Sequence, residues 1–108
     1  MDVKYLSTFK DFSPEKLKKN GVFQTARFFL DVYCLKVGQS QAAHVHAESD
    51  KVYLVLEGSC RFTVDGENAV HGSGAAVLAP AGSPHGLENV GPGDARVLVL
   101  MTPPPGKR

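Results

Sequence analysis

The feature that most constrains this 108-residue chain is a pair of histidines, His44 and His46, set one residue apart between Gly38 and Gly58. Alternate residues of a β-strand project from the same face, with a rise of roughly 3.3 Å per residue. Both imidazoles can therefore reach one point, which is how a strand builds half of a metal site. A second glycine-bounded stretch, residues 74–89, offers a third imidazole, His85, just after a Pro-Gly turn.

Most of the chain after residue 23 is typical of short strands separated by turns. Asp65-Gly66 favours a tight hairpin turn because both residues tolerate positive φ. Turn signals at intervals of roughly 8 to 12 residues indicate an all-β sandwich or barrel. The predicted strands cover residues 25–37, 41–46, 52–56, 60–64, 69–71, 75–79 and 95–101.

A single short helix is predicted before these strands, over residues 13–21. Ser13 can cap its N-terminus, Pro14 suits its first turn, and Asn20-Gly21 can end it by adopting the left-handed conformation. Residues 1–12 alternate weakly and are expected to form an edge strand or an arm. The lysines near the helix are expected to lie on its solvated face: Lys16, Lys18 and Lys19.

These features divide the chain into three predicted parts. Residues 1–22 form the arm and the short helix, and residues 23–102 form one β-barrel domain. Residues 103–108 form a proline-rich tail that cannot pair in a sheet. A chain with 43% hydrophobic residues can bury a core of this size.

The two glycine-bounded stretches together resemble the two motifs of the cupin superfamily, G-x5-H-x-H-x3,4-E-x6-G and G-x5-P-x-G-x2-H-x3-N. The second motif matches at every specified position from Gly74 to Asn89. The first departs at one position, because Lys51 stands where the family has its metal-binding glutamate. The resemblance implies a small single-domain cupin of the type-2 conserved barrel kind, with a double-stranded β-helix or jelly-roll fold.

The resemblance also implies a site and a range of activities. His44, His46 and His85 would point into the barrel and hold a divalent transition metal such as Fe, Zn, Ni or Mn. Related proteins carry out dioxygenation, isomerisation or decarboxylation of small organic acids or sugars. Three-histidine cupins without the glutamate look most like dioxygenases, and Lys51 could then neutralise a substrate carboxylate or an enolate. The alternatives are a metal-poor cupin that binds a small anionic ligand without catalysis, and a purely structural dimer component.

Lys51 leaves several arrangements open. Beside a divalent ion at about 5 Å, with an effective dielectric of about 20, its ammonium group would be repelled by roughly 6 to 7 kcal/mol. The side chain could turn outward to Glu48, Asp50 or Glu88, it could be neutral, or the metal could be absent. A further alternative makes Asp50 or Glu48 a metal ligand in place of the missing glutamate.

Other residues are weaker candidates for the site. Tyr53 shares the face of Lys51 and is predicted either to line the cavity as a second catalytic group or to be a plain core tyrosine. Arg27, Phe29 and Tyr33 alternate along one strand and could form part of the cavity wall. His71 lies outside both motifs and is expected on the surface.

Charge and hydropathy exclude several function classes. The net charge of +1 provides no strongly basic surface for binding nucleic acid or an anionic membrane. No apolar run approaches the roughly 20 residues that a membrane span needs, and the first residues do not open a signal peptide, so a cytoplasmic location is expected. Cys34 and Cys60 match no zinc or redox motif and are expected to be small buried hydrophobes.

A homodimer is also expected. The apolar runs 28–32 and 97–100 are predicted to be edge strands that need covering. The resemblance to small cupins, which usually pair through such edges, implies the same. A small molecule held inside the barrel is the other expected partner.

Overall fold

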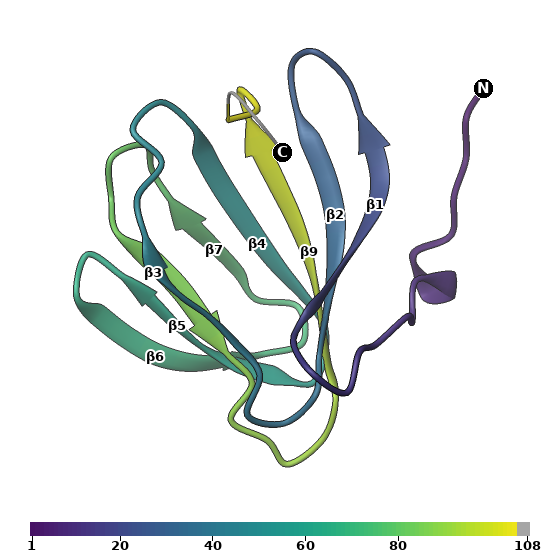
Figure 1. The fold of residues 1–108 in the computed structure, drawn as a ribbon, viewed down its shortest axis with the longest axis vertical. Coiled ribbons are helices and arrows are strands. Elements are labelled where there is room, and N and C mark those ends of the chain that lie inside the picture. The colour runs from purple at the N-terminus through teal and green to yellow at the C-terminus, as the bar shows by residue number, and fades with distance from the viewer. Residues whose placement is uncertain (106–108) are drawn as a thin grey trace.

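Two antiparallel β-sheets packed face to face make up the protein, as seen in a computed structural model that describes residues 1–105 (Figure 1). The larger sheet has the strand order β1-β2-β9-β4-β7, and the smaller one has the order β3-β8-β5-β6. This arrangement confirms the predicted all-β jelly roll. The strands are β1 (Lys18–Gln24), β2 (Phe29–Leu35), β3 (Ser40–His44), β4 (Asp50–Glu57), β5 (Ser59–Val64), β6 (Glu67–Gly72), β7 (Ala76–Ala79), β8 (His85–Glu88) and β9 (Ala95–Thr102).

The predicted helix over residues 13–21 is wrong. The one helical element among residues 1–105 is a single 3-10 turn, η1 (Leu6–Thr8). Strand β1 instead begins at Lys18, and its residues Asn20 and Gly21 pair with Val32 and Asp31 of β2. A helix of nine residues is marginal alone, whereas a strand here completes its backbone hydrogen bonds with β2. Within residues 1–105, no helix is both long and apolar enough to span a membrane.

The N-terminal arm lies beside β1 and covers the outer face of the larger sheet (Figure 1). The Arg96 guanidinium donates hydrogen bonds to the carbonyl oxygens of Leu6 and Phe9, at 2.9 and 3.4 Å. These contacts hold the arm against the sheet, although β1 begins inside the segment that was assigned to the arm. The division into arm, barrel and tail stays a prediction. The apolar contacts join Leu6, Phe9 and Phe12 to Val22, Val32 and Cys34.

A second core fills the space between the two sheets, and it includes Val97 and Val99 from β9 and Phe62 and Leu87 from the smaller sheet. Both cysteines are free and buried, as predicted. Burial raises the pKa of the Cys34 and Cys60 thiols to about 11, so both stay protonated at neutral pH. They act as small core side chains.

The two apolar runs expected at sheet edges lie inside the larger sheet, so that prediction is wrong. Strand β2 pairs with β1 and β9, and β9 pairs with β2 and β4. Their backbones are paired on both sides, and Val32, Val97 and Val99 belong to the two cores. Dimerisation stays a prediction, but exposed edges at these two runs no longer support it.

Candidate metal centre

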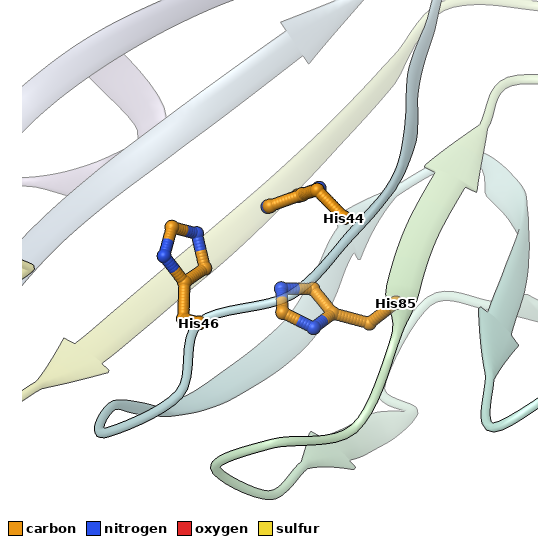
Figure 2. Close-up of side chains that lie close together, drawn as sticks. All are labelled: His44, His46 and His85. Carbon is orange, nitrogen blue, oxygen red and sulfur yellow. The ribbon is translucent and has the colours of Figure 1, made fainter.

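The three histidines gather at one end of the smaller sheet, around a common space (Figure 2). His44 is the last residue of β3, His46 follows in the loop, and His85 is the first residue of β8. Their ring centroids are 4.4 to 5.6 Å apart. One nitrogen atom from each ring lies within 4.8 Å of the others, so this imidazole cluster could hold a metal ion.

A β-bulge aims His44 at the cluster. His44 pairs with His85 and Gln41 with Leu87, so two alanines of β3 lie opposite the single residue Gly86 of β8. A Cβ atom on Gly86 would lie 2.6 Å from the Gln41 carbonyl oxygen and 2.9 Å from the backbone nitrogen of Ala43. Only glycine therefore permits the two strands to approach this closely.

Backbone carbonyl groups fix two of the rings. His44 Nδ1 lies 2.9 Å from the Ala42 oxygen, and His85 Nδ1 lies 2.9 Å from the Ser83 oxygen. A carbonyl oxygen only accepts, so each Nδ1 donates its proton and the lone pair stays on Nε2. Metal-ligating histidines are oriented in this same way.

The buried His85 ring supplies the strongest indication of a bound ion. His85 is 1% exposed, and its Nε2 atom has no hydrogen-bond partner among residues 1–105. An unsatisfied buried polar atom costs about 1–3 kcal/mol. A metal ion shared with His44 and His46 would satisfy that lone pair, so the donor set fits a transition metal.

Burial also keeps the three imidazoles in the neutral form, which can bind a cation. It is the largest influence on all three rings and lowers the pKa of His44, His46 and His85 below 6.5. The nearby Lys51 ammonium lowers these pKa values further, while the backbone hydrogen bonds of His44 and His85 oppose the shift. The imidazoles are therefore neutral at neutral pH, which is the form that binds a metal.

The turn before β8 is tied to the loop that carries His46. Gly82, at φ +85°, donates its N–H to the His46 carbonyl oxygen at 2.9 Å. The Asp50 carboxylate accepts the Ala81 N–H, also at 2.9 Å. Asp50 therefore holds the turn, and neither Asp50 nor Glu48 belongs to the metal-ligating group found among residues 1–105.

Lys51 points into the barrel, so an outward orientation toward Glu48, Asp50 or Glu88 is wrong. It is 1% exposed, and its Nζ atom donates a hydrogen bond to Gln41 Oε1 of the facing sheet at 3.1 Å. Burial lowers the pKa of Lys51 to about 8, Lys19 acts in the same direction, and Asp31 opposes both. The charged form still predominates at neutral pH.

A cavity of about 130 Å³ is lined by Lys51 and by His46, one member of the imidazole cluster. Phe29 and Tyr33 line it, as the alternation along β2 predicted, whereas Arg27 is not part of its wall. Arg27 is exposed, and its carbonyl oxygen accepts a hydrogen bond from Thr102. The polar and charged residues of the wall are Lys19, Asp31, Gln41, His46 and Lys51.

Lys19 is the site residue that sequence reasoning missed. It was assigned to the solvated face of a helix, but in β1 it pairs with Tyr33, and its Nζ atom lies 5.4 Å from the Tyr33 ring centroid. The turn that pairs β1 with β2 closes through a hydrogen bond from the Thr25 N–H to the Phe28 oxygen. Residues 25–28 contain no glycine, proline, asparagine or aspartate, so no local signal predicted this hairpin.

Tyr53 and His71 are the two remaining residues that the sequence analysis considered for the site. Tyr53 is fully buried, with its ring centroid 5.1 Å from that of Phe62 and 6.4 Å from that of His85. Burial raises its pKa well above the usual range, and its hydroxyl has no hydrogen-bond partner among residues 1–105. It belongs to the core and is not part of the wall of the 130 Å³ cavity. His71 is exposed on β6, as predicted.

Two solved structures resemble this chain over nearly its full length. The TT1209 protein from Thermus thermophilus is 44% identical, with a TM-score of 0.93 over 95% of this chain and 98% of that one. An RmlC-like cupin protein from Desulfovibrio desulfuricans is 30% identical, with a TM-score of 0.85 over 96% of this chain and 98% of that one.

A curated relative and a family match agree with these structures. The uncharacterized protein MJ1618 from Methanocaldococcus jannaschii is 32% identical over 68 residues, which are 63% of this chain and 54% of that protein. This chain therefore spans about half the length of that relative. Residues 31–101 match the cupin domain, and they include the imidazole cluster and Lys51. With its two-sheet jelly roll and these matches, the chain belongs to the cupin domain family.

Proposed function

We propose that this protein is a small cupin that binds a divalent transition metal through His44, His46 and His85 and acts on a small organic acid. The observation that carries the proposal is the buried Nε2 atom of His85, which has no partner among residues 1–105 and belongs to a ring clustered with two other neutral imidazoles. Three protein ligands leave coordination positions open for water or substrate. Imidazole ligands suit Fe, Zn and Ni, and Mn is the remaining candidate.

In this proposal the imidazole cluster and Lys51, which lie on different sheets, have different roles. The imidazoles hold the ion, and Lys51, held by Gln41, offers its positive charge to the carboxylate of the acid. A bound ion would supply Lewis acid or redox chemistry, which corresponds to an isomerase-like or a dioxygenase-like reaction. A carboxylate beside Lys51 would also offset the repulsion between its ammonium group and the ion.

A second candidate function is the binding of a small anion without metal or catalysis. It is favoured by the position of Lys51, which stands where the cupin motif has an acidic ligand and so lowers the affinity of the site for a cation. In this case the cavity would act as a sensor or storage site for the anion. Lys51 would then carry the binding energy in place of the ion.

Elemental analysis separates the two functions. Protein purified without added metal, and protein dialysed against Fe, Zn, Ni or Mn, is expected to hold about one equivalent per chain. A content below about a tenth of an equivalent under all these conditions would reject metal binding and support the anion-binding function. Turnover of organic acids by the metal-loaded protein then tests catalysis.

A further inference from the structure

Two lysine side chains reach the same cavity from different strands of the larger sheet. The Nζ atoms of Lys19 and Lys51 lie 5.4 and 5.3 Å from the ring centroid of Tyr33. We call these two residues the lysine pair. Two ammonium groups that line one small cavity repel each other, and an anion bound in that cavity would be attracted to both.

The charges around the cavity indicate a single carboxylate. Asp31 also lines the cavity, and its carboxylate acts against the lowering of the Lys51 pKa, so it offsets part of the positive charge. Gln41 Oε1 accepts one of the three donors of the Lys51 ammonium group, which leaves donors for a ligand. Pro105, on another part of the wall, has no backbone N–H to offer. Among the described residues of the wall, the lysine pair carries the positive charge, because His46 is neutral, so the pair is the main attraction for an anion.

The volume of the cavity limits the size of the ligand. An engineered cavity of about 150 Å³ in another protein holds one benzene molecule, which has six non-hydrogen atoms. A cavity of about 130 Å³ should therefore hold a molecule of about that size. A sugar acid or a long dicarboxylate would extend beyond this volume.

From these three observations we propose that the cavity binds a short monocarboxylic acid of the 2-oxo or 2-hydroxy type. Its carboxylate is held by Lys19 and Lys51, and its other oxygen points toward His46, which also lines the cavity. The proposal rests on the proposed function in one respect, because that second oxygen faces the metal held by the imidazole cluster. The carboxylate subsite itself needs only the lysine pair.

Pyruvate is a suitable probe, and its affinity can be measured by isothermal titration calorimetry on zinc-treated and metal-free protein. Lys19→Met is expected to weaken pyruvate binding about tenfold, since it removes one charge-assisted contact. Lys18→Met is the matched control because Lys18 precedes Lys19, points to the other face of β1 and lies 3.6 Å from Asp11. It removes the same charge and is expected to leave the affinity unchanged.

Two further ligands test charge and size. Pyruvamide has as many non-hydrogen atoms as pyruvate but no charge, and it should bind at least about tenfold more weakly. The larger 2-oxoglutarate should also bind more weakly than pyruvate. The proposal is overturned if pyruvate does not bind, if Lys19→Met and Lys18→Met have equal affinity, or if either comparison ligand binds as tightly as pyruvate.

Metal content measured on the same samples distinguishes this proposal from the proposed function. Pyruvate binding that depends on Lys19 in a protein that takes up no metal would keep the carboxylate subsite and reject the metal site. Full metal content with no effect of Lys19→Met would do the reverse. Thermal unfolding of each variant checks that the fold is retained.

Discussion

The imidazole cluster and the lysine pair lie on facing sheets, and they are built in different ways. The cluster is placed by features that glycines mark in the sequence, namely a bulge opposite Gly86 and a turn through Gly82, while nearby carbonyl groups orient two of the rings. The lysine pair is placed by strand register, which sets Lys19 opposite Tyr33 and Lys51 opposite Met101. The side of the site that carries the imidazole cluster, which we call one wall, is thus marked by recognisable glycines, whereas the facing wall, formed by the lysine pair, depends on strand register that no such residue marks.

The two walls also have opposite electrostatic character. Burial keeps the imidazoles neutral and ready for a cation. Burial lowers the pKa of Lys51 only to about 8, so the facing wall still attracts an anion at neutral pH. A ligand that interacts with both walls needs a negative end and a neutral oxygen, which a short 2-oxo acid has.

The largest expected effect is on metal content, which should differ between a variant of one wall and a variant of the other. His85→Ala removes the most buried imidazole and should reduce the bound metal from about one equivalent to less than about a tenth. Lys51→Met keeps the three ligands and should retain the metal fully. Elemental analysis of both variants makes the comparison, and equal loss of metal in Lys51→Met would mean that the walls do not act separately.

The next effect tests the local geometry under the cluster. Gly86→Ala forces a Cβ atom against the backbone of Gln41 and Ala43, which should lower the free energy of unfolding by about 2 kcal/mol and reduce metal content. Gly93→Ala is the matched control, since nothing lies within 4 Å of its added Cβ atom. Urea unfolding measures both, and equal midpoints for the two variants would remove the role of the bulge.

The sequence predicted the wall that carries the imidazole cluster well. The resemblance to the two cupin motifs implied that His44, His46 and His85 converge, and the structure brings them together. The hairpin at Asp65-Gly66 was predicted because both residues tolerate positive φ, and both have positive φ, 53° and 79°. The turn signals predicted seven of the nine strands and an all-β sandwich or barrel, and the resemblance to the cupin motifs implied the jelly roll.

The sequence could not predict the wall that depends on register. Ser13 and Asn20-Gly21 resemble helix caps, yet pairing with β2 determines the structure of this segment and turns Lys19 toward the cavity. The inward direction of Lys51 depends on its pairing with Met101 and on Gln41 of the other sheet. Neither contact is visible in a local pattern.

A smaller effect concerns how Lys51 couples stability to pH. Its pKa falls from 10.5 to about 8 on folding, so the unfolded chain binds more protons between these values and stability rises with pH. The free energy of unfolding of the wild type, relative to Lys51→Met, should increase by about 1 kcal/mol from pH 7 to pH 9. Chemical unfolding at several pH values measures this difference.

Lys18→Met is the control for that measurement, because the side chain it removes is half exposed to solvent. Its stability should run parallel to that of the wild type over the same pH range. A Lys51→Met curve that also runs parallel would show that Lys51 is not desolvated in the folded protein.

The smallest effect tests the assignment of Asp50 to structure. Asp50→Ala removes the acceptor of the Ala81 N–H and should cost less than about 1 kcal/mol, because that exposed amide can bond to water instead. Metal content should stay at the wild-type level. Loss of metal comparable to that in His85→Ala would make Asp50 part of the centre and would blur the distinction between the two walls.

The segment after β9 has a consequence for how the ligand range of this protein can change. Pro105 forms part of the cavity wall, and the Pro103 carbonyl oxygen accepts a hydrogen bond from the Ser49 hydroxyl at 2.6 Å. Residues 103–105 lie beyond the end of β9 at Thr102 and take no part in strand pairing. Substitutions there can reshape the entrance to the barrel while both sheets keep their hydrogen bonds, so selectivity and folding can evolve independently at this position.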